Sequence, residues 1–319
     1  MRAFGAFVGG AALTAVAMMG CGGSGGDTSG SGGHAGSANH TSGSGGHSTT
    51  TTTTTSTASG GGATTSSSTG GGDVFKSAGC GKTGAAKGVQ NLSIESNGSR
   101  TYVLSVPDDY DANKPLALVF GWHGIGGNGS GIRPYLGLEK PAAGQAIFVY
   151  ADAIPQASEG GQIGWDLKAD GVDVALFDAL LSSVEDAYCV HTDRVFSTGY
   201  SHGGYMSNLL GCVRGDKLRG IAPIAGGGPY SGSCKGPLAA MVIHGSADQT
   251  VVLDNGVKSR DYWLKADGCG TTSAPSDPAP CVSYADCSAG HPVAWCQHDG
   301  AHIVPDFAHE GVWAFFASL

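Results

Sequence analysis

The chain has 319 residues, 17 of them Lys or Arg and 26 Asp or Glu, which gives a net charge of -9 and a pI of about 5.6. This acidic balance argues against a nucleic-acid-binding protein and against a polybasic membrane-binding surface. Only 13% of the residues are charged, and many of the 56 glycines lie in residues 22–73, so the average composition hides two different regions.

Residues 1–20 have the pattern of a secretory signal. A short positive start precedes an apolar stretch, residues 3–19, that is too short and too rich in Gly and Ala for a membrane span. It ends in Met18-Met19-Gly20-Cys21, which resembles a bacterial lipobox. We predict that Cys21 is lipidated and becomes the mature N-terminus, so that a lipid anchor holds the exported protein at the cell envelope. The alternative is ordinary secretion after cleavage nearby.

Residues 21–73 are rich in Gly, Ser and Thr and lack large apolar side chains. Such a segment cannot bury a core, so we predict a disordered linker. From residue 74 the composition is that of a globular protein, and residues 74–319 have the length of one α/β domain. We therefore predict that the chain consists of a signal peptide, a linker and one catalytic domain.

Apolar patterns predict alternating strands and helices in the domain. Asn97-Gly98 separates two short β patterns and is a strong signal for a hairpin turn. Continuous apolar runs predict strands buried on both faces, whereas apolar residues three and four apart predict helices. The predicted strands are 92–95, 101–106, 116–122, 146–150, 195–200, 221–225, 239–244 and 292–298, and the predicted helices are 172–188, 203–213, 258–265 and 310–318. This alternation predicts a doubly wound, mostly parallel α/β sheet.

The strand 195–200 runs into Gly199-Tyr200-Ser201-His202-Gly203, a G-x-S-x-G pattern. In this pattern a strand turns sharply into a helix at the serine, which exposes its hydroxyl, and the flanking glycines let the helix approach closely. Ser201 is therefore the predicted nucleophile of an α/β-hydrolase fold. An acid and a histidine have to follow after later strands, in that order.

Two later strands are each followed by a residue of the required type. Asp248 comes after 239–244 and His302 after 292–298, at the strand ends where active sites gather in open α/β sheets. We predict that His302 takes the proton of Ser201 and that Asp248 orients the imidazole. The alternative acids are Asp254 and Asp261, and the alternative bases are His298 and His309. Their positions in loop, helix or strand make structural or solvent-facing roles the expectation for them.

The strand 116–122 ends in a glycine-rich loop, residues 123–127. A loop in this place supplies one backbone N–H of an oxyanion hole, and the residue after the nucleophile supplies the other. We predict the amides of Ile125 and His202, with Gly124 as the alternative to Ile125, and we expect His123 to shape its loop. The candidates for contact with an aromatic acyl group are Trp122, Trp165 and Tyr200.

Nine cysteines are an awkward odd number for an exported protein. If Cys21 carries lipid, an even set remains for disulfides in an oxidising compartment: Cys80, Cys189, Cys212, Cys234, Cys269, Cys281, Cys287 and Cys296. No Cys-x-x-Cys pair occurs, so we expect no zinc cluster. The predicted serine-hydrolase chemistry needs neither a metal nor a cofactor, and we predict neither. Cys189 precedes the nucleophile strand and Cys212 lies far along the next helix, both at the amino edge of the predicted sheet. We therefore predict a Cys189–Cys212 disulfide.

Several further motifs carry a resemblance to a known family. They are Ser77-Ala78-Gly79-Cys80-Gly81-Lys82, Gly164-Trp165, Tyr200-Ser201-His202-Gly203-Gly204, Gly290-His291-Pro292-Val293-Ala294-Trp295-Cys296 and Asp299-Gly300-Ala301-His302. Through them, residues 77–319 resemble the carbohydrate esterases that include feruloyl esterases, and more distantly the polyhydroxybutyrate depolymerase-like esterases. The resemblance maps the nucleophile, acid and base onto Ser201, Asp248 and His302. The chain departs from the family pattern at His202 and Ala301.

The resemblance implies a disulfide-stapled serine esterase that releases hydroxycinnamic acids such as ferulate from plant cell-wall polysaccharide. Two other esterase activities fit the same scaffold: acetylxylan esterase and short-chain polyhydroxyalkanoate depolymerase. A different class, a surface lipoprotein that only binds glycan, is a further alternative, although an intact triad argues against it. We expect a monomer whose partner is the feruloylated polysaccharide or oligosaccharide substrate.

Overall fold

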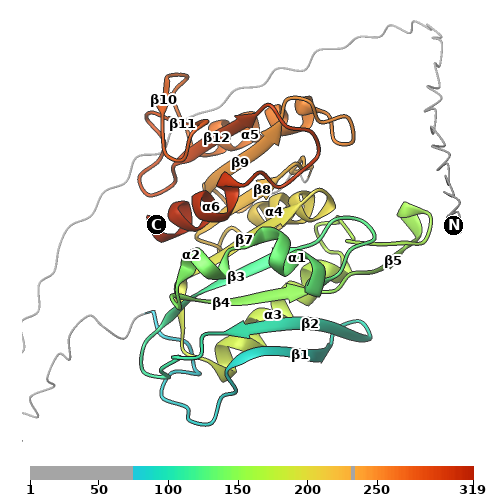
Figure 1. Cartoon of the computed structure of the whole chain (residues 1–319), viewed down its shortest axis with the longest axis vertical. Coiled ribbons are helices and arrows are strands. Elements are labelled where there is room, and N and C mark those ends of the chain that lie inside the picture. The colour runs from blue at the N-terminus through green and yellow to red at the C-terminus, as the bar shows by residue number, and fades with distance from the viewer. Residues whose placement is uncertain (1–74, 231–233) are drawn as a thin grey trace, which may run out of the picture. The chain divides into compact units, whose positions relative to one another are not determined.

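A ten-stranded sheet runs through the computed structural model, which describes residues 75–230 and 234–319 (Figure 1). Its order is β1 (Gly88–Glu95), β2 (Ser99–Val106), β4 (Ala146–Ala151), β3 (Leu116–Trp122), β7 (Val190–Tyr200), β8 (Gly220–Ile224), β9 (Ala239–Gly245), β12 (Val293–His298), β11 (Cys281–Tyr284) and β10 (Ser273–Pro275). The strands from β4 to β12 in this order run parallel, and antiparallel strands flank them on both sides. The predicted mostly parallel sheet is confirmed.

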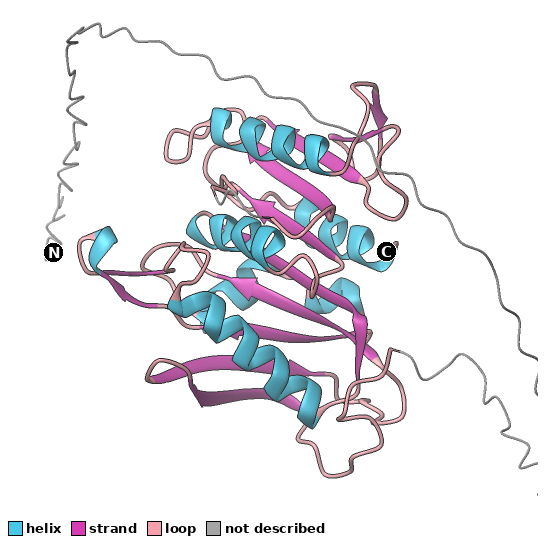
Figure 2. Cartoon of the chain, turned by 180° about the vertical axis from the view of Figure 1, so that it is seen from behind, coloured by secondary structure: helices cyan, strands magenta, loops and turns pink. Residues whose placement is uncertain are grey.

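Helices cover both faces of the sheet, which confirms the doubly wound topology. The helices α3 (Val172–Ala187), α4 (His202–Val213) and α5 (Leu253–Ala266) lie in front in Figure 2. The helices α1 (Gly129–Leu136), α2 (Glu139–Ala142) and α6 (Phe307–Ala317) cover the opposite face and lie in front in Figure 1. Each face is closed by its own apolar cluster of buried side chains.

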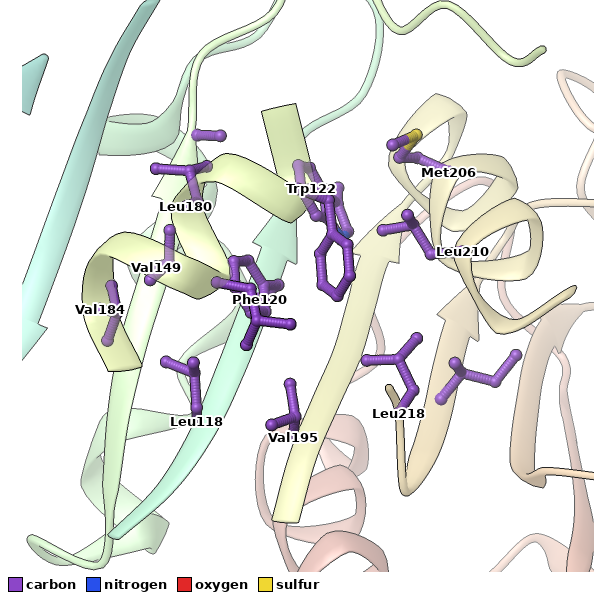
Figure 3. Packing of buried hydrophobic residues seen from close by; sticks show 14 of the residues in the cluster. Leu118, Phe120, Trp122, Val149, Leu180, Val184, Val195, Met206, Leu210 and Leu218 are labelled. Atoms are coloured by element: carbon purple, nitrogen blue, oxygen red, sulfur yellow. The ribbon is translucent and has the colours of Figure 1, made fainter. Parts of the chain in front are cut away.

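The central strand β3 shows how the sequence builds both clusters. Its side chains alternate between the faces because a strand has a period of two residues. Phe120 and Trp122 point to the cluster under α3 and α4, where Figure 3 shows them near Leu180, Met206 and Leu210. Ala117 and Val119, which alternate with the residues of the first cluster, belong to the other cluster. A run that is apolar at almost every position is therefore the expected pattern for this strand.

The predicted turn between β1 and β2 is confirmed. The two strands pair along their whole length, from Glu95 with Ser99 to Gly88 with Val106. Asn97 has a φ of 52° and Gly98 a φ of 100°. Asn and Gly are the residues that adopt this left-handed region at least cost, which is why they mark tight hairpin turns.

A small hairpin was not predicted. The strands β5 (Ile154–Gln156) and β6 (Gln162–Gly164), joined through the 3₁₀ turn η1 (Ala157–Glu159), form a separate two-stranded sheet between β4 and α3. The hairpin projects beyond the carboxyl ends of the parallel strands (Figures 1 and 2). Strands of three residues carry too little periodicity for a sequence pattern to predict them.

Three predicted features lie outside the described residues: the signal 1–20, the lipidated Cys21 and the linker 21–73. They stay predictions. Within residues 75–230 and 234–319, no helix has the length and apolar character needed to cross a bilayer.

The eight cysteines of the described residues form four disulfides, but the predicted Cys189–Cys212 pairing is wrong. The pairs are Cys80–Cys189, Cys212–Cys234, Cys269–Cys287 and Cys281–Cys296. The segment before β1 lies along the start of β7, where Ser77 N–H donates to the Val190 carbonyl oxygen, and so brings Cys80 to Cys189. Near the end of α4 the returning loop donates from Lys235 N–H to the Cys212 carbonyl oxygen. Long-range contacts of loops, which the strand pattern does not reveal, choose the partners.

Asp267 is a buried carboxyl at the end of α5 whose titration is expected to affect stability. Its Oδ1 accepts the Leu238 amide at 2.7 Å, while its Oδ2 has no hydrogen-bond partner among the described residues. Burial raises its pKa to about 7, although the Leu238 hydrogen bond lowers it. The pKa of Asp267 is higher in the folded than in the unfolded protein, so the protonated carboxyl favours the folded state. Its contribution to the free energy of unfolding is complete below about pH 4 and is lost as the pH rises to about 7.

We expect the variant Asp267→Asn to remove most of this pH dependence. Asn keeps an acceptor for the Leu238 amide but cannot ionise. Between pH 4 and 8 the melting temperature of the variant should therefore fall less than that of the wild type. At pH 8 the free energy of unfolding of the variant should be higher by a few kcal/mol, since one unit of pKa shift corresponds to about 1.4 kcal/mol. Calorimetry across this range measures the effect, with the exposed Asp193→Asn as control. Parallel wild-type and Asp267→Asn curves would contradict the expectation.

Candidate active site

Ser201 lies at the turn between β7 and α4, in a backbone conformation that residues with a side chain rarely adopt. Its φ is 56° and its ψ -120°. Strain of this kind persists only where the surroundings impose it, and it is typical of functional sites. A Cβ on Gly203 would overlap the Trp122 carbonyl group, and a Cβ on Gly199 would overlap the Gly203 backbone. The two glycines of the pattern are therefore required for the close approach of helix and strand.

Ser201, His302 and Asp248 lie in one hydrogen-bonded line. His302 Nε2 is 2.9 Å from Ser201 Oγ, and His302 Nδ1 is 2.7 Å from Asp248 Oδ2. Asp248 follows β9 and His302 follows β12, and these strands are direct neighbours in the sheet. A carboxylate only accepts, so Nδ1 carries the proton and Nε2 is free to accept one from the serine hydroxyl. The structure thus brings the three predicted residues together.

The carboxylate of Asp248 is held from several sides. Its Oδ1 accepts the amides of Thr250 and Val251, both at 2.9 Å. Burial raises the pKa of Asp248, but the hydrogen bonds from His302, Val251 and Thr250 outweigh it and hold the pKa below its usual range. The buried His244 donates from Nε2 to the Val251 carbonyl oxygen at 2.7 Å and so fixes the same turn. Asp248 is therefore an oriented anion at neutral pH.

Four alternative residues lie outside this line: Asp254, Asp261, His298 and His309. Both aspartates lie on α5, where each forms an ion pair with a cation of the same helix. His298 is the last residue of β12, and its Nδ1 accepts the amide of Gly300 at 3.0 Å. His309 lies in α6. None of the four residues is therefore placed in the hydrogen-bonded line of Ser201, His302 and Asp248.

The loop of residues 123–127, which we call the oxyanion loop after its predicted role, lies against Ser201. A Cβ on Gly124 would stand 3.2 Å from the Cβ of Ser201. His123 holds this loop: its Nδ1–H donates to the Gly124 carbonyl oxygen at 2.7 Å, and its Nε2 accepts the Ala153 amide at 3.0 Å. Burial lowers the pKa of His123, which keeps the ring neutral and its hydrogen bonds intact.

The amides of Ile125 and His202, the predicted oxyanion donors, are both adjacent to this contact. His202 begins α4, and the first amides of a helix have no acceptor within it. Among the described residues neither amide donates to a backbone carbonyl oxygen outside its own helix or strand. Both N–H groups are therefore available to a negatively charged oxygen, which the positive end of the helix dipole also favours.

A cavity of about 250 Å³ opens next to Ser201. Its walls include Gly124 and Tyr200, which adjoin Ser201, and Ile132 and Tyr135 of α1. The rings of Tyr135 and Tyr200 meet edge to face at 5.2 Å, and Tyr200 donates from its hydroxyl to the His302 carbonyl oxygen at 2.7 Å. The structure therefore places the predicted Tyr200 in the wall of an aromatic pocket.

Trp122 and Trp165 were expected to contact substrate, and the structure corrects this expectation. Each is 1% exposed, and their rings meet edge to face at 5.0 Å inside the core. Trp122 donates from Nε1 to Ser197 Oγ at 2.9 Å, and Trp165 from Nε1 to the His123 carbonyl oxygen at 2.7 Å. A strand covered on both faces, such as β3, buries the side chains of both faces, so its pattern does not distinguish a core tryptophan such as Trp122 from one in a pocket.

The helix α1, which supplies Ile132 and Tyr135 to the cavity, was missed. Its glycines and Pro134 have poor helix propensity, so its pattern is weak. The available signal was Asn128, whose side-chain oxygen accepts the Gly131 amide at 2.8 Å and caps the helix. Asn is a preferred residue at this position.

The arrangement is suited to acyl transfer. It offers a hydroxyl nucleophile, a base within hydrogen-bond reach, a carboxylate that orients the base and two amides for a developing oxyanion. Within residues 75–230 and 234–319, no group of three or more His, Cys, Asp or Glu side chains is placed to hold a metal ion.

Comparison with known proteins gives close relatives by sequence. The chain is 36% identical over 261 residues to feruloyl esterase C of Emericella nidulans, which covers 75% of this chain and 90% of that protein. It is 33% identical over 269 residues to feruloyl esterase D of Neurospora crassa, at 76% and 90% coverage. No family model matches the chain.

Solved structures share the fold at low sequence identity. An acetyl xylan esterase from Aspergillus awamori superposes with a TM-score of 0.58 at 15% identity and covers 72% of this chain and 99% of its own. A ferulic acid esterase from Anaeromyces mucronatus, solved with ferulic acid, gives a TM-score of 0.51 at 16% identity, with 75% and 93% coverage. These likenesses confirm the α/β-hydrolase fold.

Proposed function

The chain belongs to the feruloyl esterase family, and we propose that it hydrolyses the esters that link hydroxycinnamic acids such as ferulate to plant cell-wall polysaccharide. The observation that carries the proposal is the line of Ser201, His302 and Asp248 next to a cavity with tyrosine walls. The line supplies a complete set of groups for ester cleavage. The cavity supplies an aromatic surface for the acyl group.

In the proposed reaction Ser201 Oγ attacks the ester carbonyl carbon while its proton passes to His302 Nε2. The amides of Ile125 and His202 stabilise the resulting oxyanion. His302 then protonates the leaving sugar hydroxyl, which leaves the acyl group on Ser201. A water molecule, deprotonated by His302, releases the acid and restores the hydroxyl. Asp248 accepts the hydrogen bond from His302 Nδ1–H throughout and stabilises the imidazolium.

The cavity is the proposed acyl pocket. Tyr135 is 39% exposed and stands edge-on to Tyr200, so its ring is accessible from the cavity. Aromatic rings favour edge-to-face and offset contacts, worth about 0.5–1.5 kcal/mol beyond the area that they bury. A phenolic acyl group in this position gains contacts with the tyrosine rings and Ile132 that an acetyl group does not reach.

We expect Tyr135→Ala to lower kcat/KM for methyl ferulate by about tenfold, the effect of losing one aromatic contact together with apolar surface. Turnover of p-nitrophenyl acetate should stay within about threefold, because an acetyl group does not extend to Tyr135. The matched control Tyr135→Phe keeps the ring and loses only the hydroxyl, which accepts the Val304 amide at 3.0 Å. Equal losses for both substrates in Tyr135→Ala would contradict an aromatic acyl pocket here.

A substrate panel tests the function as a whole. Methyl ferulate, acetylated xylan and hydroxybutyrate oligomers represent the proposed activity and the two other esterase activities, and we expect the highest kcat/KM with methyl ferulate. A preference for acetylated xylan or for the oligomers would replace the proposed substrate but keep the esterase. Absence of hydrolysis and of fluorophosphonate labelling would favour a protein that only binds glycan.

We further propose that the enzyme acts outside the cytoplasm on a lipid anchor at Cys21, as a monomer tethered by residues 21–73. The four disulfides support an oxidising compartment, since such bonds are rare in the cytosol. Incorporation of labelled palmitate into the full chain, and its loss in Cys21→Ser, tests the anchor. Gel filtration of the purified protein tests the monomer.

A further inference from the structure

The side chain of His202 has a function that the general reaction does not require. His202 follows the nucleophile, and its ring is buried, with 7% of the residue exposed. Its Nδ1 accepts the amide of Trp165 at 3.2 Å, across 37 residues of sequence. A Cβ on Gly164 would stand 3.0 Å from the same nitrogen. The glycine thus leaves the space that the imidazole needs to reach this segment.

The segment that His202 holds also holds the oxyanion loop. We call residues 163–165, the end of β6 and Trp165, the tie segment. Its Ile163 carbonyl oxygen accepts the Gly126 amide at 2.8 Å, and its Trp165 Nε1–H donates to the His123 carbonyl oxygen at 2.7 Å. Both contacts bracket Ile125, the predicted donor of the loop.

The tie segment therefore connects the two halves of the oxyanion hole. One half is the loop amide of Ile125, and the other is the amide of His202 at the start of α4. We propose that the neutral imidazole of His202 is a positioning residue that, through the tie segment, fixes the separation of the two oxyanion donors. The inference rests on the proposed esterase function. Donors have to stand at hydrogen-bond distance from the oxyanion, and removal of one typically costs about 10²–10³-fold in kcat.

The proposal predicts that protonation of the His202 imidazole lowers kcat at acid pH. A protonated imidazole has two N–H donors and no acceptor, so it cannot accept the Trp165 amide. Burial lowers the pKa of His202 below its ordinary value. Among the groups that face the ring, Glu159 of η1 and Asp173 of α3 raise the pKa, and His123 lowers it. Tyr205 contributes a ring contact. The ring is consequently neutral near pH 7, and the connection is lost only at lower pH.

The test compares His202→Leu, which removes the acceptor, with His202→Asn, whose Oδ1 stands the same number of bonds from the backbone as Nδ1. The substrate is p-nitrophenyl acetate, so the result does not depend on the acyl pocket. We expect His202→Leu to lose about 10- to 100-fold in kcat, with KM within about threefold of the wild-type value. The variant should also bind phenylboronic acid more weakly by a similar factor, because the boronate oxygen occupies the oxyanion hole. His202→Asn should stay within about fivefold of the wild type. His191→Asn, at the far end of β7, is the matched control.

The pH dependence gives a readout that does not require the leucine variant to fold. Below the pKa of His202, kcat of the wild type should fall by about a further 10- to 100-fold relative to His202→Asn, which is the loss expected for His202→Leu. The profile of His202→Asn should lack this further fall. Equal kcat values for His202→Leu and the wild type, equal losses in both variants, or the same shape of pH profile in His202→Asn and the wild type would each overturn the proposal. A wild type without esterase activity would instead refute the proposed function.

Discussion

Replacing Ser201 by Ala should abolish ester turnover while leaving the fold intact. We expect kcat to fall by about 10⁴- to 10⁶-fold, the range seen when the nucleophile of a serine triad is removed. The Ser201 hydroxyl contacts His302 Nε2 and caps no helix, so little folding energy is lost with it. Ala has the same Cβ as Ser and bears the same backbone strain at a φ of 56°. The melting temperature should therefore stay within a few degrees of the wild-type value.

Kinetics with methyl ferulate and a thermal melt on the same samples measure both parts of this prediction. Ser182→Ala, an exposed serine on α3, is the matched control and should behave as the wild type. A fluorophosphonate should label the wild type and the control but not Ser201→Ala. Residual turnover within tenfold of the wild type would mean that a different group is the nucleophile.

The second large effect is expected from Asp248→Asn, with a loss of about 10⁴-fold in kcat. The side chain keeps its shape, but its amide presents N–H donors where the carboxylate only accepts. Facing His302 Nδ1 at 2.7 Å, an amide N–H favours the tautomer whose proton is on Nε2, and that nitrogen can no longer take the proton of Ser201. The negative charge that stabilises the imidazolium is lost as well.

The alternative acid provides the control for this variant. Asp254→Asn removes a carboxylate of the same type from α5, where it pairs with Lys258, and should leave kcat within about threefold. Circular dichroism and the melting temperature report whether either variant is folded. The opposite pattern, with activity lost in Asp254→Asn and kept in Asp248→Asn, would identify Asp254 as the acid.

The sequence was most informative where local pattern and chemistry agree. The run 116–122 predicted β3 with its observed bounds, because a strand buried on both faces has to be apolar at nearly every position. The order of Ser201, Asp248 and His302 could be predicted because each residue follows a strand, and the carboxyl ends of parallel strands lie at one edge of the sheet. The structure brings these three residues together for that reason.

Contacts between distant segments could not be predicted in this way. The partner of Cys189 depends on where the segment before β1 lies, and the surroundings of Trp122 depend on how α3 and α4 cover β3. The tie between His202 and Trp165 joins a helix to a hairpin that has no clear periodicity of its own. Such contacts are decided by packing in three dimensions, and only the unusual His202 after the nucleophile indicated that something was to be found.

The position of β12 has a consequence for the biosynthesis of the enzyme. This strand and the His302 that follows it come after Ser201 and Asp248 in the chain, and β12 has to pair with β9 before His302 can reach Asp248. A ribosome makes Ser201 and Asp248 earlier, so a nascent or shortened chain that lacks β12 has the proposed nucleophile and acid but not the proposed base. With these roles, ester cleavage can begin only once β12 is in place. Esterase activity therefore reports chains in which β12 has been made and paired with β9.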